Sequence, residues 1–179
     1  MSAASGDGGP TETFAAALDR VGVELTRTDA DGAADAVAAA VEGPAVGVPV
    51  DLEGVDLAEV SPAGDTSFTL DPMPAEIEAA ETGVTGLSLG VADYGSVVVD
   101  GDAAGTEPAS LFCERHVGVL AASDVVSGID AAFAELGEHA AAGGSAVIAT
   151  GPSATADMGD LVLGAHGPET VHVVLVEDR

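Results

Sequence analysis

The sequence contains no lysine and no tryptophan, and it has a single cysteine, Cys113. One cysteine excludes an intramolecular disulfide, and it cannot by itself hold an iron–sulfur cluster. Aromatic residues make up only 3% of the chain, so we expect a core of Val, Leu, Ala and Ile. No apolar run approaches the roughly 20 residues of a membrane-spanning helix, and the first residues lack a signal-peptide pattern. We therefore expect a soluble, cytoplasmic protein without membrane insertion.

Positive charge is nearly absent. Four arginines face 31 acidic residues, for a formal net charge of -27 in 179 residues. Nothing here could neutralise a phosphate backbone, so nucleic-acid binding is not expected. Repulsion between like charges at this density opposes compaction in dilute buffer. At molar salt the Debye length falls to about 3 Å, so this repulsion is largely screened. The simplest interpretation is a protein of an extreme halophile.

A disordered acidic chain is the alternative, but 47% of the residues are hydrophobic, which favours a folded protein. We expect residues 1–10 to be a disordered tail and residues 11–179 to form one domain. That domain divides into a variable part, 11–72, and a core, 73–179. The patterning predicts helices at 12–20, 31–41, 74–82 and 124–142, and strands at 23–26, 45–50, 86–92, 96–99, 115–121, 145–150, 161–163 and 171–176.

This order of elements predicts an α/β fold with a mostly parallel sheet between flanking helices, because the strands are near-continuous apolar runs. The helix at 124–142 is expected to begin after a Ser123 cap. Its expected buried face consists of Val125, Ile129, Ala132, Phe133 and Leu136. The residues between 99 and 115 are interpreted as a loop.

The segment Thr150–Pro168, TGPSATADMGDLVLGAHGP, is the strongest candidate for a functional loop. Glycine and proline fix its backbone between two apolar runs, and such loops carry function in α/β proteins. Its side chains Ser153, Thr155, Asp157 and His166 are the candidate polar groups. We call this segment the motif loop.

Each candidate has two interpretations. Gly151, Pro152 and Ser153 could cradle a phosphate or carboxylate, or form only a rigid turn. Asp157 could orient a ligand, although closing a local turn is favoured. His166 could act as a general acid or base, or could bond only to loop carbonyls.

Outside the motif loop, Asp93 could be a nucleophile, although a turn role is favoured. His116 and His172 are interpreted as structural, His139 as exposed, and Cys113 as a buried thiol. No ligand spacing predicts a metal site, and no catalytic triad stands out.

Three segments carry a resemblance to a known family. They are GLSLGVADYGSVVV at 86–99, SLFCERHVGVL at 110–120, and the motif loop with the strand that follows it. Their order and spacing over residues 76–179 resemble the LUD-domain family of lactate utilisation proteins. The chain departs from the family pattern at Asp93 and Tyr94 (Glu-Thr in the family), at Cys113 and Glu114 (Pro-Pro), and at Ala154 (Arg).

The resemblance implies the fold shared by ribose-5-phosphate isomerase, CoA transferases and 5-formyltetrahydrofolate cyclo-ligase. It implies an accessory subunit of L-lactate oxidation that has no cofactor of its own and assembles with Fe–S-containing partner proteins. The alternatives are a stand-alone enzyme of the CoA-transferase or cyclo-ligase type, or a sensor of a small anionic ligand. The implied ligand-binding residues are Gly95, Ser96, Gly151, Pro152, Ser153, Thr155, Asp157, His166 and Gly167.

Overall fold

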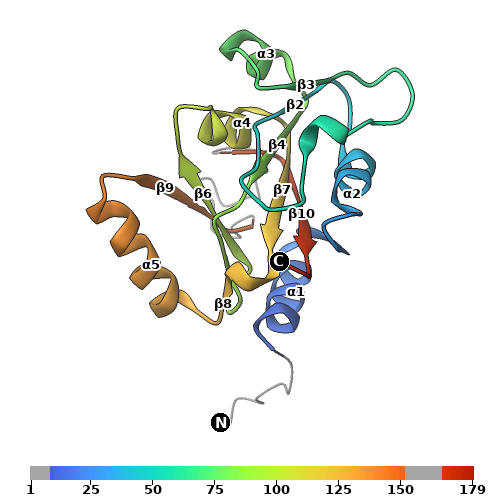
Figure 1. Ribbon diagram of the computed structural model, residues 1–179. Helices are drawn as coiled ribbons and strands as arrows, with labels where there is room; N and C mark the ends of the chain where they lie inside the picture. Colours follow the sequence, from blue (N-terminus) through green and yellow to red (C-terminus); the bar gives the residue numbers. More distant parts are fainter. Residues whose placement is uncertain (1–8, 152–166) are drawn as a thin grey trace, which may run out of the picture.

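The computed structural model describes residues 9–151 and 167–179 (Figure 1). Its centre is a six-stranded sheet in which every neighbouring pair is parallel, with the strand order β1-β10-β7-β4-β2-β3. This confirms the predicted α/β class. The strands of this sheet are β1 (Glu24–Thr28), β2 (Ala45–Gly47), β3 (Phe68–Leu70), β4 (Thr82–Gly86), β7 (Arg115–Ala121) and β10 (Thr170–Val176).

A second sheet of four strands lies beside the first, in the order β8-β5-β6-β9. It is mixed, because β6 runs antiparallel to both of its neighbours while β5 and β8 are parallel. The prediction of one sheet did not separate these strands from the others. They are β5 (Leu89–Val91), β6 (Ser96–Gly101), β8 (Val125–Val126) and β9 (Ser145–Ala149).

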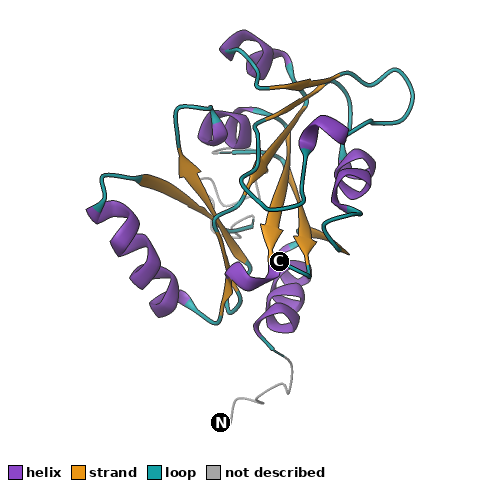
Figure 2. Ribbon diagram, viewed as in Figure 1, coloured by secondary structure: helices purple, strands orange, loops and turns teal. Residues whose placement is uncertain are grey.

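In residues 9–151 and 167–179, five α-helices surround the sheets (Figure 2). None of them is long and apolar enough to cross a membrane within the residues that were described. The helices are α1 (Pro10–Val21), α2 (Ala33–Ala40), α3 (Pro74–Ala79), α4 (Thr106–Phe112) and α5 (Ile129–Ala141).

Among the described residues, three apolar clusters hold the layers together, and all are built mainly from small aliphatic residues, as the composition predicts; the third packs α3 and α4 against β2 around Val46, Ile77 and Ala109. The first joins α2 and the segment 55–60 to one face of the parallel sheet, around Val37, Val117 and Val174. The second lies between the two sheets and includes Phe14 and Leu18 of α1. Both of these α1 side chains are fully buried, so α1 is anchored where the sheets meet.

The predicted helix at 124–142 is wrong at its start and on its buried face. Residues 122–124 form a 3-10 turn, Val125 and Val126 form β8, and the helix begins at Ile129 after Gly128. Of the expected face within α5, only Ala132 is buried, and Phe133 is 59% exposed. The helix lies on the outer side of the small second sheet (Figure 1). This sheet does not cover all the apolar side chains of α5, so Phe133 stays exposed.

The loop predicted between 99 and 115 contains α4. Asp102 explains the helix, since its Oδ1 accepts hydrogen bonds from the backbone N–H groups of Ala104, Gly105 and Thr106. The α4 backbone also lies so close to Gly83 of β4 that a Cβ there would collide with the carbonyl of Ala109. The start of β4 at Thr82 was not predicted either. The predicted helix at 74–82 extended to that residue, whereas α3 ends at Ala79.

Candidate functional site

The start of the motif loop is tied to the start of β6. Ser96 Oγ lies 2.6 Å from Thr150 Oγ1, and Ser96 is 3% exposed. One residue further along, Gly151 lies against α1 so closely that a Cβ would be 2.7 Å from the carbonyl oxygen of Val21. Two of the predicted ligand-binding residues, Ser96 and Gly151, therefore lie at one place.

The turn between β5 and β6 also rests on α1. Gly95 has a φ of 66°, and a Cβ there would lie 2.8 Å from the backbone carbon of Ala17. Arg20 Nη2 donates to the carbonyl oxygen of Asp93 at 3.1 Å. Helix α1 thus supports both the turn and the start of the motif loop, and we call Arg20, Asp93–Ser96 and Thr150–Gly151 together the loop mouth.

Asp93 is exposed, as a turn residue would be. Its side chain lies against the beginning of α5, where a Cβ on Gly128 would be 2.5 Å from Oδ2. A carboxylate near a helix N-terminus is favoured by the helix dipole. This position gives Asp93 a structural role beside the nucleophilic role that the sequence left open.

The other end of the motif loop returns to different elements. A Cβ on Gly167 would lie 3.9 Å from Leu111 of α4, and the N–H of Glu169 donates to the carbonyl of Glu114 at 2.7 Å. The remaining candidates, Pro152, Ser153, Thr155, Asp157 and His166, lie outside the described residues, as does the strand predicted at 161–163.

A buried histidine lies in the middle of the parallel sheet. His116 is 2% exposed, and its Nε2 lies 2.8 Å from Thr85 Oγ1 on β4. Burial lowers the pKa of His116 from its ordinary 6.5 to about 4. The imidazole is therefore neutral at neutral pH, consistent with the structural role predicted for it.

A polar cluster at the amino ends of β1, β10 and β7 was not predicted. Arg115, which is 9% exposed, donates from Nε to the carbonyl of Ala40 at 2.8 Å and from Nη2 to Glu24 Oε2 at 2.5 Å. His172 Nδ1 lies 3.2 Å from the same carboxylate oxygen, and its Nε2 lies 2.8 Å from Thr26 Oγ1. The hydrogen bond from Arg115 holds the pKa of Glu24 below its usual range.

This cluster links structural elements to one another. The Arg115 side chain satisfies the C-terminal end of α2 through Ala40, and it links three adjacent strands through Glu24 and His172. Burial lowers the pKa of His172, partly offset by the Glu24 carboxylate, so the neutral ring is favoured. Ligands of open α/β sheets bind at the carboxyl ends of strands rather than at their amino ends.

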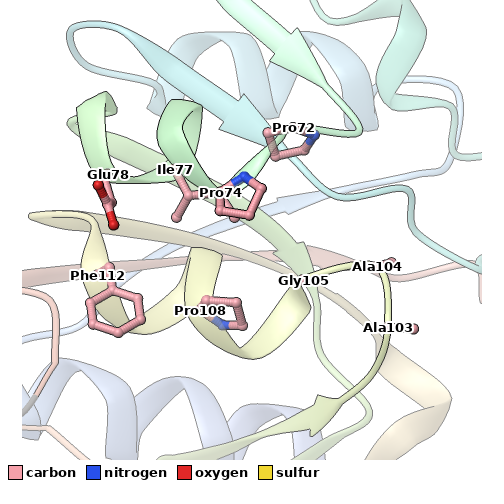
Figure 3. A pocket seen from close by; sticks show the side chains of 9 residues that line it. All are labelled: Pro72, Pro74, Ile77, Glu78, Ala103, Ala104, Gly105, Pro108 and Phe112. Atoms are coloured by element: carbon pink, nitrogen blue, oxygen red, sulfur yellow. The ribbon is translucent and has the colours of Figure 1, made fainter.

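The described surface has cavities beside α4 and beneath α5. The first, of about 230 Å³, lies between α3 and α4 and is mainly apolar; its walls include Pro74, Ile77, Pro108 and Phe112 (Figure 3). Phe112 is 73% exposed, and Met73 at the start of α3 is 67% exposed.

The second cavity, of about 320 Å³, lies beneath α5. Asp100, Asp124 and Glu135 line it, so its charge repels an anion. His139 also lines it and is half-buried rather than exposed, with Nε2 3.2 Å from the carbonyl of Ser145.

Neither a metal cluster nor a reactive thiol is found in residues 9–151 and 167–179. No group of three or more His, Cys, Asp or Glu side chains there could hold a metal ion. Cys113 is 2% exposed, and burial raises the pKa of its thiol to about 11. The thiol is therefore protonated and inert at neutral pH.

The arginines differ in how they are paired. Arg27, Arg115 and Arg179 each lie within 4.0 Å of a carboxylate: Glu12, Glu24 and Asp178 are their nearest partners. Within the described part of the chain, Arg20 has no carboxylate partner, and its side chain donates a hydrogen bond to the carbonyl of Asp93.

Comparisons with known proteins agree with the fold. The family model of the LUD domain matches residues 12–176. A solved structure, that of a DUF162 family protein from Deinococcus radiodurans, superposes with a TM-score of 0.73 at 21% sequence identity, covering 93% of this chain and 96% of that one. No curated protein matches the chain.

Proposed function

Because this chain belongs to the LUD-domain family, we propose that it serves as an accessory subunit in the oxidation of L-lactate to pyruvate. The family is associated with lactate utilisation, and the match extends over residues 12–176, nearly the whole chain. That membership is the observation that carries the proposal. In this role the chain contributes a binding and assembly surface, and partner proteins transfer the electrons.

The proposed partners contain Fe–S clusters, because the oxidation releases electrons and the single cysteine of this chain cannot by itself hold a cluster that would accept them. Its one cysteine is buried and protonated, whereas clusters are held by several Cys thiolates. We therefore place the clusters on the partner proteins.

We assign the cavity between α3 and α4, called the hollow from here on, to the partner as its binding surface. Only Glu78 is charged among the residues that line it, in a chain where 20% of the residues are charged. Phe112, which lines it, and Met73, which lies in sequence between the lining residues Pro72 and Pro74, expose apolar side chains to water. Exposed apolar patches rimmed by polar residues mark protein interaction sites, and molar salt strengthens such contacts.

The residues support the subunit role better than a stand-alone CoA-transferase-like or cyclo-ligase-like enzyme. Substrates of those enzymes carry several anionic groups, and three of the four arginines are already paired with carboxylates. Asp93, Asp157 and His166 stay candidate catalytic residues for that alternative, and a sensor of a small anion requires no catalytic group.

Co-purification tests the subunit role. A tagged chain isolated in molar KCl from lactate-grown cells is expected to bring down proteins that contain iron and acid-labile sulfide. Phe112→Asp should abolish this association, because it places a charge on the apolar wall of the hollow. Phe133→Asp is the matched control, since Phe133 is 59% exposed but lies on α5, outside the hollow. Recovery of the wild-type chain without iron-containing proteins would contradict the proposal.

A further inference from the structure

The guanidinium of Arg20 has N–H donors that no hydrogen bond of the described residues uses. A guanidinium offers several N–H donors in a planar fork that matches a carboxylate. The described contacts of Arg20 use one of them, from Nη2 to the carbonyl of Asp93. The other three arginines are neutralised by carboxylates, although 31 acidic residues are available to pair with all four.

The location of Arg20 is as specific as its chemistry. It is the last residue but one of α1, and the neighbouring Val21 contacts Gly151 at the start of the motif loop. Its own hydrogen bond holds the turn that leads to Ser96, whose hydroxyl pairs with Thr150. One exposed cation and two hydroxyls therefore belong to the same loop mouth.

Nearby negative charge does not neutralise this arginine. The Asp93 side chain lies against Gly128 at the beginning of α5, and no ion pair joins it to Arg20 among the described residues. With no lysine in the chain, Arg20 is the side chain best able to attract an anion at this place.

We propose that Arg20 binds the carboxylate of a small monocarboxylate ligand, of the 2-hydroxy or 2-oxo acid class, at the loop mouth. This deepens the proposed function, on which the choice of ligand rests. The guanidinium receives the carboxylate through its unused N–H groups, and the exposed Thr150, whose hydroxyl is held by the buried Ser96, offers a hydroxyl contact to a 2-hydroxyl or 2-oxo group. Large polyanionic ligands do not fit, because a single cation serves the site.

Binding of L-lactate and pyruvate tests this site directly. Potassium L-lactate or pyruvate is titrated in place of KCl, at constant molar potassium, while the thermal midpoint and the dissociation constant are measured. The wild-type chain should be stabilised, since a ligand that binds only the native state raises its midpoint. Arg20→Gln should weaken binding at least tenfold, and Arg20→Lys should weaken it less because it keeps the charge.

Arg27→Gln is the matched control, because it removes an equal charge from a guanidinium already paired with Glu12 and Glu177. It should keep wild-type affinity. A second measurement needs no variant: saturating lactate should slow the modification of Arg20 by phenylglyoxal, as mapped by mass spectrometry. Equal affinity of wild type and Arg20→Gln, or no binding of either acid by the wild type, would overturn the site.

The two proposals can fail separately. If deletion of the gene impairs growth on lactate while the chain binds neither acid, the Arg20 site is wrong and the subunit role stands. If the chain binds lactate through Arg20 but deletion leaves growth on lactate intact, the site stands and the subunit role is wrong.

Discussion

The hydroxyl of Ser96 lies 2.6 Å from the hydroxyl of Thr150, which joins the first residue of β6 to the residue that follows β9. The two strands are antiparallel neighbours, with Val97 opposite Ala149. The side-chain bond therefore extends the pairing of the second sheet to its end, where the motif loop begins. It fixes the point from which that loop leaves the sheet.

The effects of removing the two hydroxyls on the free energy of unfolding should not be additive. Ser96 is buried, so Ser96→Ala is expected to lower the free energy of unfolding by about 1 kcal/mol, and Thr150→Val by a similar or smaller amount. The double variant should lose less than the sum, because the first substitution already removes the bond. Urea unfolding in molar KCl measures all four corners of this cycle, and strictly additive losses would show that the hydroxyl pair contributes nothing.

Arg115 should be the arginine on which the fold depends most. Arg115→Gln leaves the carbonyl of Ala40 and the carboxylate of Glu24 without their donor. We expect a loss of about 2–3 kcal/mol, below the usual cost of breaking a buried pair because the Glu24 side chain is 59% exposed and can be hydrated. Arg27→Gln changes the net charge equally but removes a surface pair, so its loss should be clearly smaller. Equal losses in unfolding experiments would mean that net charge, not the cluster, sets the effect.

His116 should make the protein acid-sensitive. Its pKa is about 4 in the native state against 6.5 ordinarily, so below pH 6.5 the unfolded chain takes up a proton that the native chain does not. Stability that is intact above pH 6.5 is therefore lost as the pH falls towards 4, by up to roughly 3 kcal/mol. His116→Gln should remove this component, seen as a flatter difference in unfolding free energy between pH 6.5 and 4 at fixed molar KCl. Identical pH slopes for the variant and the wild type would refute the assignment.

The central strands could be predicted from the sequence because strands buried on both faces are recognisable there as apolar runs. Strand β7 has the predicted bounds, Arg115–Ala121, and β10 begins one residue before the predicted 171. Both are covered on two faces, so they are continuous apolar runs. In α5 the helical spacing of apolar residues misled the prediction, because only Ala132 of the expected face within the helix is buried and Phe133 is exposed to water.

Contacts between distant segments could not be predicted. The Glu24–Arg115–His172 cluster exists only because β10 lies between β1 and β7, and the sequence does not state that order. The sequence did not indicate Arg20 as a candidate binding residue either. Its place beside the motif loop depends on the turn at Asp93 and on the packing of Gly151 against α1. Gly95, Ser96 and Gly151 of the loop mouth are among the residues that the resemblance implies for ligand binding, and that role stays a prediction.

Growth of the host tests the central claim, a role in lactate oxidation, most directly. The gene is deleted, and growth on L-lactate is compared with growth on pyruvate at the host's own salt concentration. We predict a defect on lactate alone, restored by the wild-type gene. Equal growth of the deletion strain and the wild type on both acids, with no second copy of the gene present, would contradict the proposed function.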